Sequence, residues 1–114
     1  MSFSIKIFEG AFMGKLESKF QSNLVHELEE RYPNCVVLKN DPRHKQGFPD
    51  LTVLYKDKWA VLECKRSINE HKQPNQDKYV EKLNGMSYSA FIFPENREQI
   101  LNELDRLFER GEHE

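Results

Sequence analysis

Three charged residues interrupt two stretches of sequence that otherwise predict buried β-strands. Asp50 begins an apolar run after a Gly-Phe-Pro tripeptide, and Glu63 and Lys65 lie inside the next apolar run. The two runs, at about 50–55 and 58–65, predict a β-hairpin because a short polar turn separates two strand-forming segments. Two carboxylates and an ammonium group on one face of such a hairpin could bind a cation and act on a charged substrate.

The turn of the hairpin decides whether the three charged side chains meet. Side chains alternate along a strand, so Glu63 and Lys65 share one face. A two-residue turn at 56–57 places Asp50 opposite Glu63 on that face. A turn at 57–58 places Asp50 opposite Lys65, one diagonal step from Glu63. Either turn brings the three groups together, whereas a three-residue loop separates them.

The opposite face of the predicted hairpin is apolar apart from one phenol hydroxyl. Its residues are Leu51, Val53, Tyr55, Ala60, Leu62 and Cys64. This face therefore predicts the contact with the hydrophobic core. Trp59 shares the charged face, and we expect it to pack under the first helix rather than to stack on a base.

A further carboxylate falls on a helix face that should be buried. The segment 14–32 carries apolar residues at helical spacing, namely Leu16, Phe20, Leu24, Val25, Leu28 and Tyr32. At about 100° per residue, Glu17 lies near the middle of this stripe, with Gln21 beside it. A carboxylate in that place should be paired or bound to a metal. The alternative is that Glu17 lies in a frayed first turn, where the positive end of the helix favours it.

This set of carboxylates predicts a hard divalent cation. Carboxylates within a few ångströms repel one another and need a positive partner. Oxygen ligands suit Mg²⁺ or Mn²⁺ rather than zinc. No zinc spacing is found among the four histidines, His26, His44, His71 and His113. A divalent cation beside Lys65 suits phosphodiester hydrolysis, because it polarises the phosphate and acidifies a bound water. An ordinary ion pair across the hairpin is the simpler alternative.

The rest of the pattern predicts a mixed β-sheet flanked by helices. Alternating Phe3, Ile5 and Ile7 predict an edge strand or dimer arm at the N-terminus, within 1–13. The further expected elements are a helix at 14–32, strands at 35–38, 50–55 and 58–65, a helix from the cap Asn75 to Asn84 with Gly85 as its stop, a strand at 87–93, and a helix opened by a capping box of Asn96 and Gln99. The fold class is therefore α/β, in the order (β)αβββαβα.

Length and composition predict a single globular domain over 1–114. The chain has 114 residues, of which 38% are hydrophobic and 32% charged. No apolar run approaches the roughly 20 residues that span a bilayer, and the N-terminal segment lacks the features of a signal peptide. Cys35 and Cys64 have no metal-like spacing, so we expect buried thiols in an intracellular protein.

Charge is unevenly distributed along the chain. The net charge is −2, yet residues 38–82 hold ten Lys and Arg against seven Asp and Glu. A basic region of this kind favours contacts with phosphate. Our candidates for such contacts are Arg43, His44, Lys45, Arg66 and Lys72. For the first three, a solvated loop is the alternative interpretation.

The Gly-Phe-Pro-Asp sequence ending at Asp50, followed after twelve residues by Glu63-Cys64-Lys65, resembles the signature of the PD-(D/E)XK nuclease superfamily. The chain looks most like the small phage VRR-NUC-type endonucleases and the archaeal and phage Holliday-junction resolvases. Those families have a helix with an acidic residue, a Gly-x-Pro-Asp strand start, a Glu-x-Lys strand and a following helix opened near a glutamine. The resemblance covers about 14–93 and implies a restriction-endonuclease-like fold.

The resemblance also implies a role for each matching residue. Lys65 would be the catalytic lysine. Gln76 would orient the site or bind phosphate, with Gln73 as a rival for the same place. The implied metal ligands are Asp50, Glu63, the backbone carbonyl of Cys64, and Glu17 directly or through water.

By this resemblance the chain is expected to be a Mg²⁺-dependent endodeoxyribonuclease in which Mn²⁺ can substitute. We expect a homodimer, because cutting two strands needs two sites, and a branched or junction DNA substrate. The implied setting is the cytoplasm of a bacterial or phage-infected cell. Three alternatives stay open: a non-catalytic nucleic-acid-binding module of the same fold, a protein-interaction domain, and a nuclease that acts on RNA.

Overall fold

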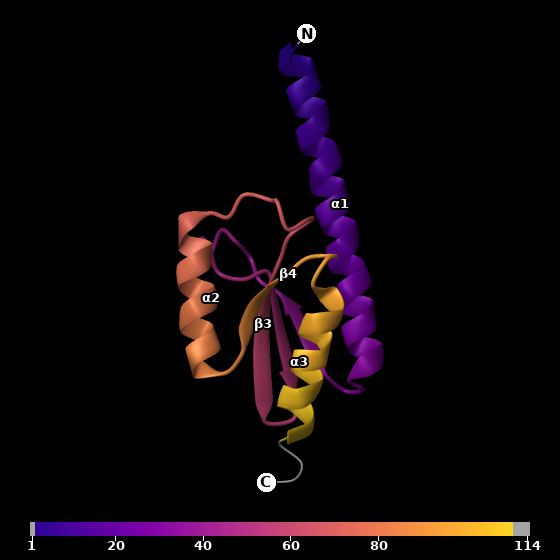
Figure 1. Cartoon of the computed structure of the whole chain (residues 1–114), viewed down its shortest axis with the longest axis vertical. Helices are drawn as coiled ribbons and strands as arrows, with labels where there is room; N and C mark the ends of the chain where they lie inside the picture. The colour runs from indigo at the N-terminus through magenta and orange to yellow at the C-terminus, as the bar shows by residue number, and fades with distance from the viewer. Residues whose placement is uncertain (1, 111–114) are drawn as a thin grey trace.

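The computed structural model describes the backbone of residues 2–110 and the side chains of residues 16–109. The three helices and four strands of this part of the chain are, in order, α1 (Ser2–Arg31), β1 (Val36–Lys39), β2 (Leu51–Tyr55), β3 (Lys58–Cys64), α2 (Pro74–Met86), β4 (Ser89–Ile92) and α3 (Arg97–Arg110) (Figure 1). The protein therefore has the mixed α/β class that the sequence predicts.

The four strands form one sheet in the spatial order β1-β2-β3-β4. β2 pairs antiparallel with both β1 and β3, and β3 pairs parallel with β4. A two-residue turn closed by Tyr55 and Lys58 joins β2 to β3, and Lys56 in this turn has a φ of 57°. A left-handed residue there suits the twist of a tight hairpin. The parallel pairing of β3 with β4 requires a crossover, which α2 provides.

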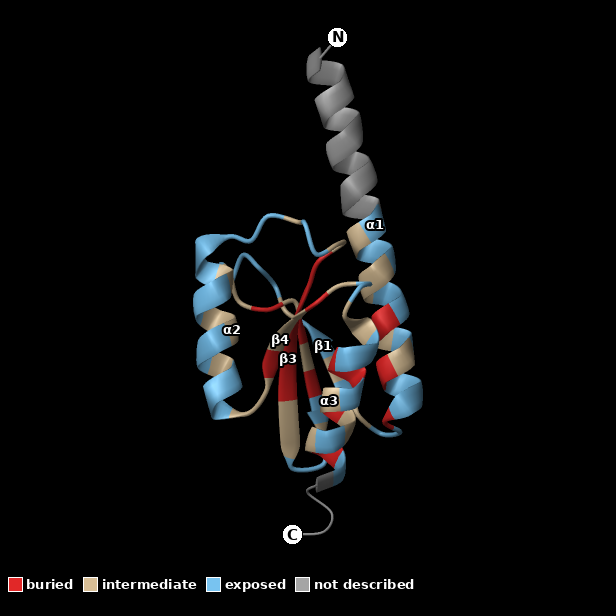
Figure 2. Ribbon diagram, viewed as in Figure 1, coloured by how far each residue is buried: buried red, intermediate tan, exposed pale blue. Residues whose placement is uncertain are grey.

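The helices divide between the two faces of the sheet. α1 and α3 cover one face, and α2 lies against the other (Figure 1). The hairpin face predicted to be apolar is confirmed as the core face. Figure 2 shows buried residues along β3 and on α1 and α3, while α2 has no buried residue. The core consists of Leu24, Leu28, Tyr32, Leu51, Val53, Ala60, Leu62, Cys64, Ile92, Ile100, Leu101, Leu104 and Phe108.

Polar contacts join the C-terminal end of α1 to α3. Arg31 donates hydrogen bonds of 2.9 and 2.6 Å to the two carboxylate oxygens of Asp105. The Tyr32 hydroxyl donates to Asp105 Oδ1 at 2.5 Å. The bonds from Arg31, assisted by that from Tyr32, hold the pKa of Asp105 below its ordinary value. Glu27 of α1 also pairs with Arg97 of α3.

The predicted N-terminal strand is wrong, because residues 2–8 belong to α1, which has 30 residues. Alternation over three positions is too short to exclude a helix, since Phe3 and Ile7 are also one helical turn apart. Extending a helix already formed by 16–31 needs no new nucleus. The side chains of the expected dimer arm lie outside the described ones. Although α1 is long, no helix in the described residues has the length and apolarity to cross a membrane.

Two predicted helix caps also need correction. Gln73, not Asn75, is the N-cap of α2, and the helix continues through Gly85 to Met86. Pro74 occupies the first helical turn, where a residue without an N–H costs little. Asn96 precedes α3 as predicted, but Gln99 donates its amide to Glu103 instead of closing a capping box.

Candidate active site

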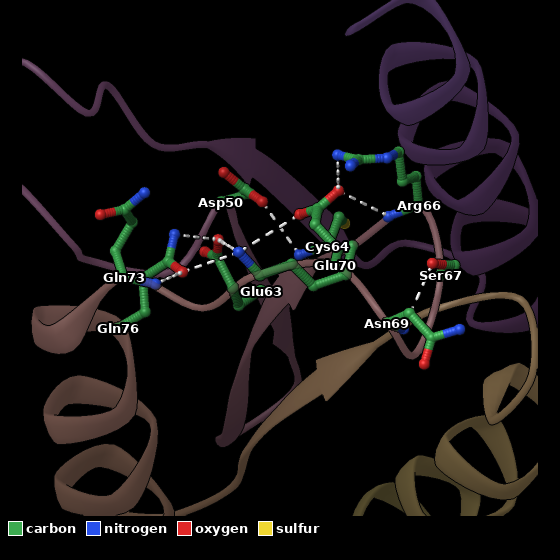
Figure 3. Close-up of polar contacts among 10 residues, drawn as sticks. Asp50, Glu63, Cys64, Arg66, Ser67, Asn69, Glu70, Gln73 and Gln76 are labelled. Atoms are coloured by element: carbon green, nitrogen blue, oxygen red, sulfur yellow. Dashed lines mark hydrogen bonds and ion pairs between the residues drawn. The ribbon is translucent and has the colours of Figure 1, made fainter. Parts of the chain in front are cut away.

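The register of the central hairpin brings Asp50 and Glu63 together. Leu51 pairs with Leu62, so one step further along the strands Asp50 lies opposite Glu63. This is the arrangement that a turn at 56–57 produces. Asp50 Oδ2 also accepts the backbone N–H of Cys64 at 2.9 Å, which anchors the carboxylate beside the end of β3 (Figure 3).

Lys65 and Gln76 complete a hydrogen-bonded chain with Glu63. Lys65 follows β3 directly, and its backbone N–H donates to Ile92 O at 2.9 Å. Its Nζ donates to Gln76 Oε1 at 2.7 Å and lies 3.7 Å from Glu63 Oε2. Gln76 Nε2 donates to the same Glu63 oxygen at 2.7 Å. The amide of Gln76 therefore orients a carboxylate and an ammonium group, and both residues are almost fully buried.

The first turn of α2 explains why Gln76, and not Gln73, reaches the site. Gln73 caps the helix, and its backbone N–H donates to Gln76 Oε1 at 3.0 Å. This contact turns the Gln76 amide towards β3, whereas Gln73 is exposed (Figure 3). The rivalry that the sequence left open is thus decided by the place of each residue in the helix.

Glu63 has one oxygen without a partner. Glu63 Oε1 is buried and accepts no hydrogen bond, whereas Oε2 is bonded by Gln76. Burial and the charge of Asp50 raise the pKa of Glu63 to about 8. Burial also raises the pKa of Asp50. Two carboxylates this close repel each other, and a positive charge beside them reduces that repulsion.

Glu17 of α1 reaches the same cluster. Its carboxylate is half-buried, and burial together with the charges of Glu70 and Asp50 raises its pKa to about 7. The helix lies over the core face of the sheet through Leu24 and Leu28 and continues past the strand ends. Glu17 therefore belongs to the site and not to an isolated frayed turn.

Glu70 is a member of the cluster that sequence reasoning missed. It lies in the loop between β3 and α2, and its buried carboxylate is 3.3 Å from Lys65 Nζ and 2.6 Å from Arg66 Nη1. Glu70 Oε1 also accepts the backbone N–H of Arg66 at 3.2 Å (Figure 3). The only signal in the sequence is an acid four residues after Arg66, and that spacing carries no structural meaning outside a helix.

The predicted basic contacts lie in two loops around the cluster. Arg43, His44 and Lys45 are exposed, and Arg43 pairs with Asp41 at 3.0 Å. In the other loop, Lys72 lies over the ring of Phe91, 4.3 Å from its centroid, and Arg66 is bonded to Glu70. Four of these five side chains are exposed, and that of Arg66 is half-buried.

Trp59 and Cys35 differ from their predicted surroundings, whereas the predicted burial of the Cys64 thiol is confirmed. Trp59 was expected under α1, but it faces the side of α2, because odd-numbered residues of β3 point away from the core. It is half-buried, and its carbonyl accepts a hydrogen bond from Ser87 Oγ. Cys64 is a free thiol in the core, where burial raises its pKa; Cys35 is also free but only half-buried.

Side chains of the cluster can supply only part of the oxygen ligands that a hard divalent cation needs. Among the described residues, no group of three or more His, Cys, Asp and Glu side chains is arranged to hold a metal ion. Mg²⁺ commonly takes one or two carboxylates and completes its shell with water and phosphate oxygens. Asp50 and the unpartnered Glu63 Oε1 fit that requirement.

Comparison of the chain with protein-family models, with curated proteins and with solved structures finds no match.

Proposed function

We propose that this protein is a Mg²⁺-dependent endonuclease that hydrolyses DNA phosphodiester bonds, with a restriction-endonuclease-like fold. The observation that carries the proposal is the buried, unpartnered Glu63 Oε1 beside Asp50, next to a buried lysine held by Gln76. Buried carboxylate oxygens without a partner are uncommon in folded proteins, which favours a ligand at this position over an ordinary ion pair across the hairpin.

Asp50 and Glu63 would hold the metal, with the backbone carbonyl of Cys64 and with Glu17 directly or through water. When bound, Mg²⁺ or Mn²⁺ would polarise the scissile phosphate and lower the pKa of a water molecule. Both cations accept the oxygen donors that these residues offer. The cation would also offset the repulsion that raises the pKa of Glu63.

Lys65 would act on the phosphate itself. Its ammonium group is buried and held by Gln76 and Glu70, so its position is set before the substrate arrives. A fixed positive charge stabilises negative charge that develops on phosphate oxygens in the transition state. Gln76 is then a positioning residue, because it bonds both Lys65 and Glu63.

The substrate and assembly in this proposal are branched or junction DNA and a homodimer. Cutting two strands requires two sites, which two copies of the chain would supply. Exposed basic side chains of the 41–48 loop would contact phosphates without reading sequence.

The test is cleavage of linear, flapped and four-way-junction DNA, and of a matched RNA, with Mg²⁺, Mn²⁺ or chelator. Glu63→Gln and Lys65→Ala are expected to abolish cutting. Matched controls are Glu81→Gln and Lys78→Ala, which change the same side-chain types on the exposed surface of α2. Metal-dependent cutting retained by both controls and lost in both site variants would support the proposal.

A folded, metal-supplied wild-type protein that cuts none of these substrates would refute it. Cutting confined to RNA would move the activity to the other nucleic acid. Tight DNA binding without cutting would favour the non-catalytic module.

A further inference from the structure

An open groove lies between β1 and the loop that leads into β2. It has a volume of about 400 Å³, within the usual size of sites for small ligands. Leu38 and Phe48 give it a mainly apolar surface, and Lys39, His44 and Lys45 add basic side chains along its lining. None of the residues that line the groove belongs to the carboxylate cluster.

The groove and the carboxylate cluster share one wall. Asn40, which lines the groove, donates its backbone N–H to Asp50 O at 2.8 Å and its side-chain amide to Pro49 O at 2.8 Å. Phe48 precedes Asp50 by two residues and packs edge-on against Tyr79 of α2, with 5.5 Å between ring centroids. A molecule in the groove would therefore lie next to whatever binds at Asp50.

The charges of the groove are positive and largely unneutralised. Within the described residues, no carboxylate pairs with Lys39 or Lys45. Asp41 is the one acid of the lining, and it accepts hydrogen bonds from the backbone N–H and the guanidinium of Arg43. An apolar, aromatic surface bordered by free positive charge is complementary to a nucleotide, which has a flat π-face and a negative phosphate.

We propose that this groove binds one unpaired nucleobase of the strand whose phosphate reaches Asp50 and Glu63. The proposal rests on the nuclease function proposed above and adds the feature that selects the substrate. A base inside a continuous duplex is paired and stacked, so entering the groove would require extrusion at a cost in free energy. Flaps, forks and junctions present unpaired bases without that cost, and the protein should prefer them.

The experiment separates base binding from cutting. Flapped DNA with 2-aminopurine at the unpaired position next to the branch is titrated with protein in chelator, and fluorescence reports stacking. Cleavage of the same flap and of the matched duplex is then measured in Mg²⁺. The variants are Phe48→Leu, which keeps an apolar contact with Tyr79, and Lys45→Ala. The control is Leu54→Ala, which removes an exposed apolar side chain of β2 outside the groove.

We expect wild type and Leu54→Ala to change the 2-aminopurine fluorescence of the flapped probe and to cut the flap in preference to the duplex. Phe48→Leu should lower affinity for the flapped probe by roughly 5- to 150-fold, the usual effect of removing one stacking partner. Its preference for the flap over the duplex should fall, and its melting temperature should stay close to wild type. Lys45→Ala should weaken binding of both substrates and reduce the salt dependence.

Cutting by wild type without a fluorescence response, or an unchanged flap preference in Phe48→Leu, would overturn the groove proposal and leave the nuclease standing. A response without cutting of any substrate would instead remove the nuclease and keep the base site. A dimer that Leu38→Asp converts to monomer, with wild-type flap preference retained, would show that a second copy covers the groove and would overturn the proposal.

Discussion

Replacing Glu63 by glutamine should stabilise the metal-free protein while removing its response to Mg²⁺. The substitution preserves the shape of the side chain and an oxygen that can accept the hydrogen bond from Gln76 Nε2. It removes a charge that is buried against Asp50. Lys65 still has a carboxylate partner in this variant, because Glu70 lies 3.3 Å from Lys65 Nζ.

The size of the effect follows from the pKa of Glu63. A rise in pKa from the ordinary value of 4.5 to about 8 means that ionising Glu63 in the metal-free fold costs about 5 kcal/mol more than ionising an ordinary glutamate. The variant recovers only part of this, because it also loses the attraction of Lys65 at 3.7 Å and still buries a polar amide. We expect a net gain of about 1–3 kcal/mol in the free energy of unfolding, or about 4–13 °C in melting temperature.

The stability difference between wild type and Glu63→Gln should depend on pH. A carboxyl with a raised pKa in the folded state adds stability below pH 4.5 that is lost as pH rises through about 8. In chelator, therefore, wild type should lose stability relative to Glu63→Gln between these values, and the two melting temperatures should converge near pH 4.5. Thermal unfolding followed by circular dichroism from pH 4 to 9 measures this difference.

Addition of Mg²⁺ at pH 8 should raise the melting temperature of wild type but not of Glu63→Gln. The control Glu81→Gln, an exposed acid of α2, should behave as wild type throughout. If Glu63→Gln is less stable than wild type at every pH, then Glu63 serves mainly as a partner of Lys65. That result would refute the argument that the paired carboxylates need a cation.

The other predictions concern positioning and packing. Gln76→Ala should lower the rate of cleavage by about 10- to 100-fold and the free energy of unfolding by about 2 kcal/mol. Gln73→Ala should lose only a helix cap. Equal cleavage rates for the two variants would contradict the role of Gln76 as a bridge between Lys65 and Glu63. Asp105→Asn should lower the melting temperature at pH 7. The loss should disappear as pH falls through the lowered pKa of Asp105, because the stability from Arg31 and Tyr32 is fully present above the ordinary pKa of 3.8 and is lost below the lowered one. A loss that persists at pH 2 would show that packing, not charge, is responsible. Chelator should stop cleavage, and excess Mn²⁺ should restore it; both effects can be measured with a fluorescently quenched DNA probe. Cleavage that continues in chelator would contradict the assignment of a metal to the site.

Much of the central hairpin could be predicted because it depends on local pattern. Alternating apolar residues on two short strands identify the core face, and the charged face follows from it. Placing Asp50 opposite Glu63 needed one further fact, the position of the turn. The register of the hairpin and the φ of 57° at Lys56 show that the chain turns at 56–57, whereas a three-residue loop would have separated the two carboxylates.

The residues that contact Glu63 and Lys65 come from segments whose positions in space no local sequence pattern determines. Glu70 lies in an irregular loop, and it meets Lys65 only because that loop folds back after β3. Gln76 and Gln73 look equivalent in the chain, and only the start of α2 at Pro74 turns one towards Glu63. The N-terminal residues 2–8 alternate like a strand, yet they continue a helix that is formed by the residues after them.

The amino-acid order alone thus determines which residues can share a face, because side-chain direction repeats every two residues in a strand and every 3.6 in a helix. It therefore identified Asp50, Glu63, Lys65 and Glu17 as candidates for one site. The tertiary structure decides which face each helix covers. Since α2 lies on the charged face, Gln76 reaches Glu63, and Trp59 packs away from α1. Packing between distant segments depends on the whole chain, so short-range periodicity cannot predict it.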